Sequence, residues 1–159
     1  MRIANEGIEL IRRTPIDLGD SLGELDFPES PEYNDRWWSG IERPSSLKRI
    51  WFSATIDEAE VARIFVEERV SIDEDYGVPR TRRAQLLEIP FFEVAVSYRG
   101  MGIGKRVIDL ITDSEPTATF AAFSEDADGF WASLGWNRFI RSDHEERPSM
   151  YRPLYMLFR

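Results

Sequence analysis

The feature that most constrains the fold of this chain is a long apolar run that leads into a glycine-rich turn. Leu86–Val96 (LLEIPFFEVAV) predicts a buried strand. Three glycines follow at every second position from Gly100, and the sequence after them is amphipathic. Its apolar stripe predicts a helix over Gly102–Thr112, with Val107, Ile108 and Ile111 facing the core. A strand, a turn and a helix in this order are typical of a crossover unit with parallel strands.

Strands are also predicted on the N-terminal side of this unit. Ile8–Arg13 predicts a short first strand, and Lys48–Ile56 (KRIWFSATI) is rich in the β-branched and aromatic residues that favour strands. Val61–Ile72 is ambiguous, because its apolar residues alternate as in a strand whereas AEVARIFVEER also contains good helix formers. The polar turn Asp57–Glu60 before it favours the hairpin interpretation.

Further elements follow the glycine-rich unit. Thr117–Phe123 predicts a strand and Asp126–Leu134 predicts a helix, with Gly135 as its C-cap. Arg138–Arg141 and Tyr151–Arg159 predict two last strands in a hairpin. Parallel strands in the crossover unit and antiparallel strands in the hairpins predict a mixed α/β (α+β) fold, with a central sheet of about seven strands flanked by helices.

Two features mark irregular parts of the chain. Pro90 lies inside the strongest strand, and because proline has no N–H to donate it indicates an edge, a bulge or a local opening of the sheet. Residues 16–46 are rich in Pro, Gly, Asp and Glu, and predict a loop with one or two short helices that covers a cleft. The length of 159 residues predicts a single domain, 1–159.

The composition excludes several classes of site and partner. No cysteine is present, which rules out disulfides, cysteine nucleophiles and thiolate metal sites. His144 is the single histidine, so a zinc site with several histidine ligands is impossible and we expect no metal. The net charge of −9 weighs against a nucleic-acid partner and modestly favours a cationic one.

The sequence also lacks the signals of export and membrane insertion. The N-terminal MRIANEGIELIRR has no apolar core of signal-peptide length. No stretch approaches the roughly 18 apolar residues of a membrane span. We therefore expect a cytoplasmic protein without a membrane partner.

The glycine-rich turn predicts an anion site, because such a turn at the start of a helix aims several backbone N–H groups at one point. Two common phosphate motifs do not fit it. The Walker A motif needs Ser or Thr after Gly-Lys, whereas Gly104-Lys105 is followed by Arg106. The dinucleotide motif needs Gly-x-Gly-x-x-Gly near the first strand, whereas here the glycines alternate and lie late in the chain.

A third pattern fits. Arg99–Gly104 (RGMGIG) resembles the Arg/Gln-x-x-Gly-x-Gly/Ala signature of the GCN5-related N-acetyltransferase (GNAT) family. Phe130–Trp136 (FWASLGW) resembles the late helix of the same family, usually Phe-Tyr-x-x-x-Gly-Phe. Both segments follow the order of the family, so the resemblance implies an acetyl-CoA-binding core over residues 86–141.

The resemblance implies a set of cofactor contacts. Main-chain groups of Val94 and Val96 would pair with the pantetheine arm of acetyl-CoA like an added strand. Lys105 or Arg106 would reach the remaining phosphate of the cofactor. The backbone N–H groups of the turn would hold the pyrophosphate, and they belong to Arg99, Gly100, Met101, Gly102, Ile103 and Gly104.

The resemblance also implies transfer of an acetyl group to an amine, a reaction that benefits from a base. Glu88 is the candidate base, because some family members carry a glutamate on this strand, and Glu93 is the alternative. The family often has a tyrosine acid in the late helix, but Trp131 stands there, and an indole N–H is no usable acid near neutral pH. Ser124 stands where the family often has asparagine.

The expected activity is that of an acetyl-CoA-dependent N-acetyltransferase that works by direct transfer in a ternary complex, since no cysteine is available as a covalent carrier. The acceptor would be a primary amine on a small molecule or a protein. Residues 16–46 would form the variable acceptor side.

Trp37 and Trp38 would line the acceptor pocket through cation–π contacts, with core packing or a dimer contact as the alternative for both rings. The resemblance makes a homodimer possible. Trp131 and Ser124 leave open a second function, a non-catalytic or weakly active acyl-CoA-binding or interaction module with the same fold.

Overall fold

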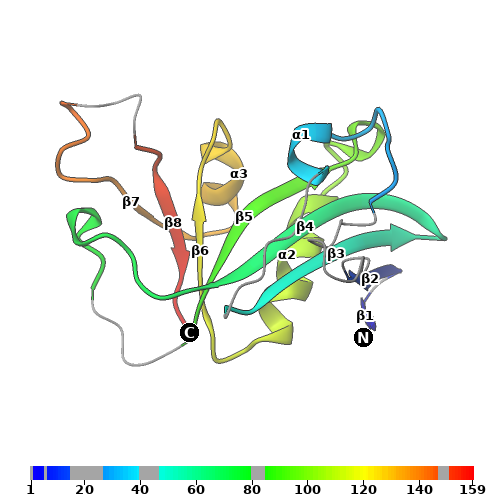
Figure 1. Ribbon diagram of the computed structural model, residues 1–159, viewed down its shortest axis with the longest axis horizontal. Coiled ribbons are helices and arrows are strands. Elements are labelled where there is room, and N and C mark those ends of the chain that lie inside the picture. Colours follow the sequence, from blue (N-terminus) through cyan, green and yellow to red (C-terminus); the bar gives the residue numbers. More distant parts are fainter. Residues whose placement is uncertain (1, 6, 15–26, 40–46, 80–84, 147–150) are drawn as a thin grey trace, which may run out of the picture. The chain divides into compact units, whose positions relative to one another are not determined.

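The computed structural model describes residues 2–5, 7–14, 27–39, 47–79, 85–146 and 151–159 of the chain (Figure 1). Its strands form a mixed sheet in the order β1-β2-β3-β4-β5-β6-β8-β7. The strands are β1 Arg2–Asn5, β2 Ile8–Arg13, β3 Arg49–Ile56, β4 Ala59–Arg69, β5 Leu86–Val94, β6 Thr119–Phe123, β7 Asn137–Phe139 and β8 Leu154–Leu157. The predicted mixed α/β fold is confirmed, and within the described residues the sheet has eight strands where about seven were predicted.

The chain divides into two compact units. The first comprises Met1–Val66 and Phe91–Ser114, and the second comprises Glu67–Pro90 and Glu115–Arg159. The strands β4 and β5 run through both units.

In the first unit, β1, β2 and β3 pair as antiparallel neighbours. The ambiguous segment after β3 is the strand β4, as the hairpin interpretation predicted. Asp57 and Glu58 form the turn between them with φ of 47° and 68°, the left-handed conformation that a two-residue hairpin requires. The first strand was not predicted: β1 precedes Ile8–Arg13, so the predicted first strand is in fact β2.

In the described residues of the first unit, the α-helices are α1 (Asp35–Trp38) and α2 (Ile103–Ser114). The helix α2 packs against β1 and β2 and buries its predicted stripe of Val107, Ile108 and Ile111. A second core cluster is aromatic and contains Tyr33, Trp38, Trp51, Phe65 and Ala95. Its strongest ring contact stacks Trp51 on Phe65, with centroids 4.6 Å apart.

In the second unit, β5 and β6 are parallel and β8 pairs antiparallel with both β6 and β7. The last hairpin is therefore confirmed, although Leu154–Leu157 is shorter than the predicted strand Tyr151–Arg159. The predicted second helix is α3 (Asp128–Ser133), and Gly135 ends it with φ of +75°, as expected of a C-cap glycine.

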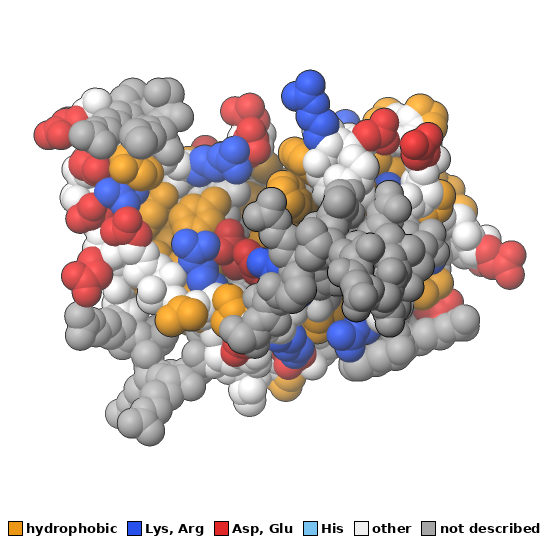
Figure 2. Space-filling model, in the orientation of Figure 1, with side chains coloured by type: hydrophobic (Ala, Val, Ile, Leu, Met, Phe, Trp, Pro, Cys, Tyr) orange, Lys and Arg blue, Asp and Glu red, His pale blue; other side chains and the backbone are white. Residues whose placement is uncertain are grey.

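A buried arginine in the second unit, Arg141, joins the segment after β7 to the loop that contains η1. The Arg141 guanidinium binds the carboxylates of Asp73, Asp75 and Asp143 and lies 3.8 Å from the ring centroid of Tyr151. Asp73 is the N-cap of the 3₁₀ helix η1 (Glu74–Tyr76) and Asp75 lies within it, and Figure 2 shows acidic side chains gathered in this region. None of the helices in the described ranges is long and apolar enough to cross a membrane.

Candidate functional site

The glycine-rich turn has the backbone that the sequence predicted. After β5 the chain forms a 3₁₀ turn, η2 (Val96–Tyr98), and α2 begins at Ile103. Gly100 and Gly102 lie between them with φ of 78° and 74°. Side-chain-bearing residues rarely adopt this conformation, so glycine is required here by the backbone itself. The strand predicted over Leu86–Val96 ends two residues earlier, at Val94. Its last predicted residue, Val96, is instead the first residue of η2.

The turn is open on its outer side. A Cβ placed on Gly100 or Gly102 would meet no atom within 4 Å, and Met101 between them is 65% exposed. The first N–H groups of α2 have no partner within the helix, and the helix dipole adds partial positive charge there. Binding of an anion by these backbone N–H groups stays a prediction, and the Arg99 N–H already donates to the Val96 carbonyl at 3.3 Å.

Two cationic side chains at the turn already have partners: that of Lys105, predicted to reach the remaining phosphate, and that of Arg99, whose backbone N–H was predicted to hold the pyrophosphate. Arg99 donates from Nε to the Val94 carbonyl at 3.1 Å and from Nη2 to Glu93 Oε1 at 3.3 Å. Lys105 Nζ lies 2.8 Å from Asp109 Oδ2. The Lys105–Asp109 pair is exposed on both sides and therefore weak, so Lys105 can exchange its carboxylate for a phosphate at little cost. The Arg99 pair is less open, because the Glu93 side chain is only 11% exposed.

The main-chain groups predicted to pair with pantetheine are engaged as well. The Val94 carbonyl accepts from Arg99, and the Val96 N–H donates to the Glu32 carbonyl at 3.3 Å. Between them, the Ala95 N–H donates to the Val61 carbonyl at 2.9 Å. The role of Val94 and Val96 in binding pantetheine stays a prediction, and binding there would exchange these contacts.

Residues 27–39 belong to the region 16–46 that was predicted to form the acceptor side, and are here called the acceptor-side segment after that prediction. This segment contacts η2 through Glu32. The Glu32 carboxylate accepts from the Ser97 N–H at 2.8 Å and from the Ser97 hydroxyl at 2.9 Å. These two hydrogen bonds lower the pKa of Glu32. Sequence reasoning missed this residue, because its partner lies 65 positions away and nothing local distinguishes it from a surface glutamate.

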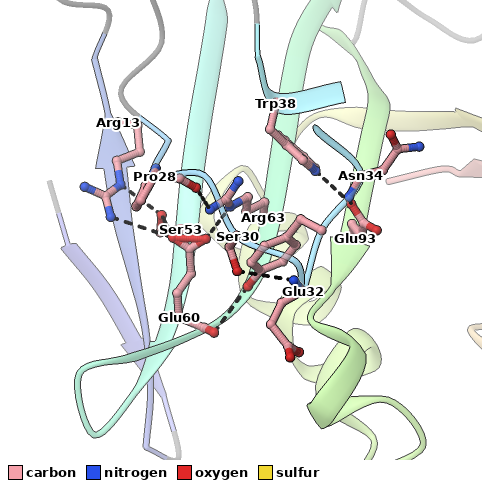
Figure 3. Close-up of polar contacts among 11 residues, drawn as sticks. Arg13, Pro28, Ser30, Glu32, Asn34, Trp38, Ser53, Glu60, Arg63 and Glu93 are labelled. Carbon is pink, nitrogen blue, oxygen red and sulfur yellow. Dashed lines mark hydrogen bonds and ion pairs between the residues drawn. The ribbon is translucent and has the colours of Figure 1, made fainter. Parts of the chain in front are cut away.

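Glu93, the alternative base, joins the acceptor-side segment to β5 (Figure 3). Its Oε2 accepts from the Asn34 N–H at 2.9 Å and from Trp38 Nε1 at 2.8 Å, while Oε1 faces Arg99. Two donors from the acceptor-side segment and one from Arg99 therefore share one carboxylate. Such a group is suited to holding structure, because taking up a proton would weaken all three contacts.

A buried ionic network fixes the other end of the segment (Figure 3). Arg63 is only 2% exposed and pairs with Glu60 Oε1, and its Nη2 donates to the Pro28 carbonyl at 2.7 Å. Its guanidinium also lies 4.1 Å from the ring centroid of Tyr33, a cation–π distance. Glu60 Oε2 in turn accepts from Ser53 at 3.1 Å. Arg63, paired with Glu60, therefore holds the acceptor-side segment at Pro28 and Tyr33.

The two predicted acceptor-side tryptophans differ in position. Trp38 is 2% exposed and lies in the aromatic core, with its ring edge against Phe27 and Phe91. Trp37 is half-buried and stacks on Phe91 at 5.6 Å between centroids. Of the two rings, Trp37 is the one whose surface remains open to a ligand.

Glu88, the candidate base, lies in the second unit. It is the last β5 residue that pairs with β6, opposite Ala121, and the ladder ends two residues before Pro90. Glu88 is 7% exposed and its Oε2 forms an ion pair with Arg69 Nη1. Burial raises the pKa of Glu88, and the hydrogen bond and charge of Arg69 oppose that rise.

The residues that depart from the family pattern take part in packing and in a turn. Trp131 is buried, with ring contacts to Phe130 at 5.0 Å and to Trp136 at 4.9 Å. The Ser124 hydroxyl accepts from the Ala127 N–H at 3.2 Å and so closes the turn that enters α3. In the described part of the chain no group of His, Asp or Glu is placed to hold a metal.

No family model matches the sequence, and no curated protein matches it. Among solved structures, the chain is similar to the N-acetyltransferase YlbP of Bacillus subtilis, solved in complex with coenzyme A, with a TM-score of 0.53 and 14% identity. The match covers 69% of this chain and 67% of that chain. The chain has the GNAT fold.

Other solved structures resemble the chain less closely. Arabidopsis thaliana Naa50, solved with a bisubstrate analogue, gives a TM-score of 0.45 at 18% identity over 67% of this chain and 69% of that one. The ribosomal-protein-S18-alanine N-acetyltransferase of Escherichia coli gives 0.42 at 15% identity, over 68% of this chain and 66% of that one. At these identities the likeness concerns the fold alone.

Proposed function

We propose that this protein is an acetyl-CoA-dependent N-acetyltransferase, which transfers an acetyl group to a primary amine on a small molecule or a protein. The observation that carries the proposal is the open glycine turn from Arg99 to Gly104 at the start of α2, in a chain with the GNAT fold. The turn offers backbone N–H groups to the pyrophosphate, and Lys105 lies beside them on the first turn of the helix.

The reaction needs few groups from the protein. Bound acetyl-CoA supplies the acetyl group as an activated thioester. The amine nitrogen forms a bond to the carbonyl carbon, the C–S bond breaks with its electron pair on sulfur, and the amine proton passes to a base. Direct transfer in a ternary complex is favoured because the chain has no cysteine to carry the acetyl group.

Glu88 is preferred to Glu93 as the base. Three donors occupy the Glu93 carboxylate, whereas Glu88 is buried at the end of the β5–β6 ladder with one arginine beside it. Burial raises the pKa of Glu88 toward the range in which a carboxylate accepts a proton efficiently. Trp37 remains the proposed acceptor contact, and a cytoplasmic location and a homodimer remain predictions.

Calorimetric titration with acetyl-CoA tests the cofactor site. Gly102→Glu adds a negative charge and a strained side chain at φ of 74°, and we expect it to abolish micromolar binding. Gly77→Glu is the matched control, because Gly77 also has a positive φ, 63°, and open space around its Cβ position but lies outside the turn. Equal binding by the wild type and Gly102→Glu would refute the site.

Thiol release from acetyl-CoA with a panel of primary amines tests the activity. Glu88→Gln removes the base without changing the size of the side chain, so we expect kcat to fall by about 100-fold while the affinity for acetyl-CoA stays the same. Unchanged turnover would remove Glu88 from the mechanism. The same assay on Glu93→Gln separates the two carboxylates.

A second function is supported by one specific observation. Trp131 is buried between two aromatic residues where the family often has a tyrosine acid, so this position has no group to protonate the leaving thiolate. A non-catalytic acyl-CoA-binding module is consistent with that packing. Tight acetyl-CoA binding without thiol release toward any amine would favour it.

A further inference from the structure

The environment of Glu88 is organised by one neighbour, Arg69 on β4. The Arg69 guanidinium has three anchors in the second unit. It pairs through Nη1 with Glu88 Oε2, donates from Nε to the Ser71 carbonyl at 3.0 Å, and lies 5.0 Å from the ring centroid of Phe123. A cation fixed from three directions holds its partner carboxylate in one orientation.

Arg69 is the charged neighbour that favours the ionised form of Glu88. The Glu88 side chain is 10% exposed, and burial disfavours its charged form. Among the residues that the structure describes, the charged groups that act on it are Arg69 and Glu67, both on β4, and its pairing partner in β6 is the apolar Ala121. Burial and Glu67 raise the pKa of Glu88, whereas Arg69 lowers it.

We propose that Arg69 is a positioning residue that keeps the Glu88 carboxylate ionised and correctly oriented to accept the proton of the attacking amine. This inference rests on the proposed function, in which Glu88 is the base. The proton moves from the amine nitrogen to a Glu88 oxygen, and the resulting neutral acid is held by Arg69 through a hydrogen bond until the proton passes to solvent. No other reactant is needed.

A purely structural role for the pair predicts different behaviour. An ion pair that only joins β4 to β5 would affect stability equally at every pH at which both groups are charged. A residue that sets the ionisation of a base instead shifts the pH at which activity appears, while the alkaline plateau stays near the wild-type value. The pH profile therefore separates the two roles.

The test compares Arg69→Met, which removes the charge, with Arg69→Lys, which retains it. Arg69→Gln is a second neutral variant that can still donate to Glu88 and Ser71, and it carries the test if Arg69→Met does not fold. Arg152→Met is the matched control, because Arg152 forms an exposed ion pair with Glu125 in the same unit. Each variant is titrated by ¹³C NMR of its glutamate carboxyl groups, with Glu88 assigned by its absence in Glu88→Gln.

We expect the Glu88 titration to move to higher pH in both neutral variants and to stay near the wild-type position in Arg69→Lys and Arg152→Met. The acidic limb of kcat/KM for thiol release should move in the same direction. Activity at its acidic end should fall by about tenfold, with little change at the alkaline plateau or in KM for acetyl-CoA.

An unchanged Glu88 titration in a folded neutral variant would overturn the proposal, as would a loss of activity that is uniform across pH. The outcome for the proposed function is read separately. If the wild-type protein binds no acetyl-CoA and releases no thiol, the enzyme assignment fails. A shifted NMR titration would then show that Arg69 controls Glu88 for a purpose other than this reaction, and the catalytic inference would be withdrawn.

Discussion

Replacing Glu93 with alanine should destabilise the first unit by leaving a buried donor without an acceptor. Trp38 Nε1 donates to Glu93 Oε2 at 2.8 Å from a side chain that is 2% exposed, so water cannot readily replace the lost partner. Asn34 and Arg99 are exposed, and water can take the place of the carboxylate at both. The loss of stability in Glu93→Ala therefore comes mainly from the unsatisfied Trp38 N–H.

The magnitude follows from that division. A buried donor left unsatisfied costs about 1–3 kcal/mol, and the two exposed contacts add at most about 1 kcal/mol together. We expect the free energy of unfolding to fall by about 2–3 kcal/mol. In a chain of this size that lowers Tm by roughly 5–10 °C. Glu93→Gln keeps an acceptor oxygen in the same place and should cost about 1 kcal/mol or less.

Urea denaturation of a double-mutant cycle measures the effect. Trp38→Phe removes the donor, so Glu93→Ala should cost about 1–2 kcal/mol less in the Trp38→Phe background than in the wild type. Glu29→Ala is the control, because Glu29 is an exposed glutamate of the same acceptor-side segment. If the two substitutions add to within about 0.5 kcal/mol, the bond between Trp38 and Glu93 contributes nothing and the reasoning is refuted.

Two further predictions concern the core and the response to acid. Val107→Ala should lower the free energy of unfolding by about 2 kcal/mol, because Val107 is fully buried in α2, whereas Val70→Ala should be nearly neutral because Val70 is 84% exposed. The Asp75 N–H and Arg141 lower the pKa of Asp73. The ionised carboxylate of Asp73 therefore stabilises the folded protein at pH values above the ordinary Asp pKa, and this stabilisation is lost as the pH falls through the lowered pKa. Urea unfolding between about pH 5 and pH 2 should therefore show a steeper loss of stability in the wild type than in Asp73→Asn, and parallel curves would contradict this.

The elements that the sequence predicted well are those whose burial leaves a local periodic pattern. Ile8–Arg13 coincides with β2, and the stripe of Val107, Ile108 and Ile111 is the buried face of α2. The glycine turn was also predictable, because the positive φ values at Gly100 and Gly102 require the residue type itself. By contrast, β1 has only four residues, too few to show alternation.

The arrangement of the acceptor side was not predictable from local sequence. Glu93 meets Asn34 across 59 positions and Arg63 meets Pro28 across 35. Each contact joins parts of the chain that are far apart in the sequence. In their local sequence, Glu93 and Arg63 look like charged strand residues that face solvent. Arg63 in particular stands among apolar neighbours in AEVARIFVEER, where an alternating pattern gives no sign that its charge is buried and paired. Most of residues 16–46 lie outside the described ranges.

The two candidate carboxylates on β5, Glu88 and Glu93, have different partners. Glu88 and Glu93 are five positions apart on this strand. Glu93 binds the acceptor-side segment, whereas Glu88 binds Arg69. A substitution at Glu93 therefore acts through the stability of that segment and of the turn that Arg99 begins. A substitution at Glu88 acts on ionisation, so equal losses of activity at the two positions have different causes that stability measurements distinguish.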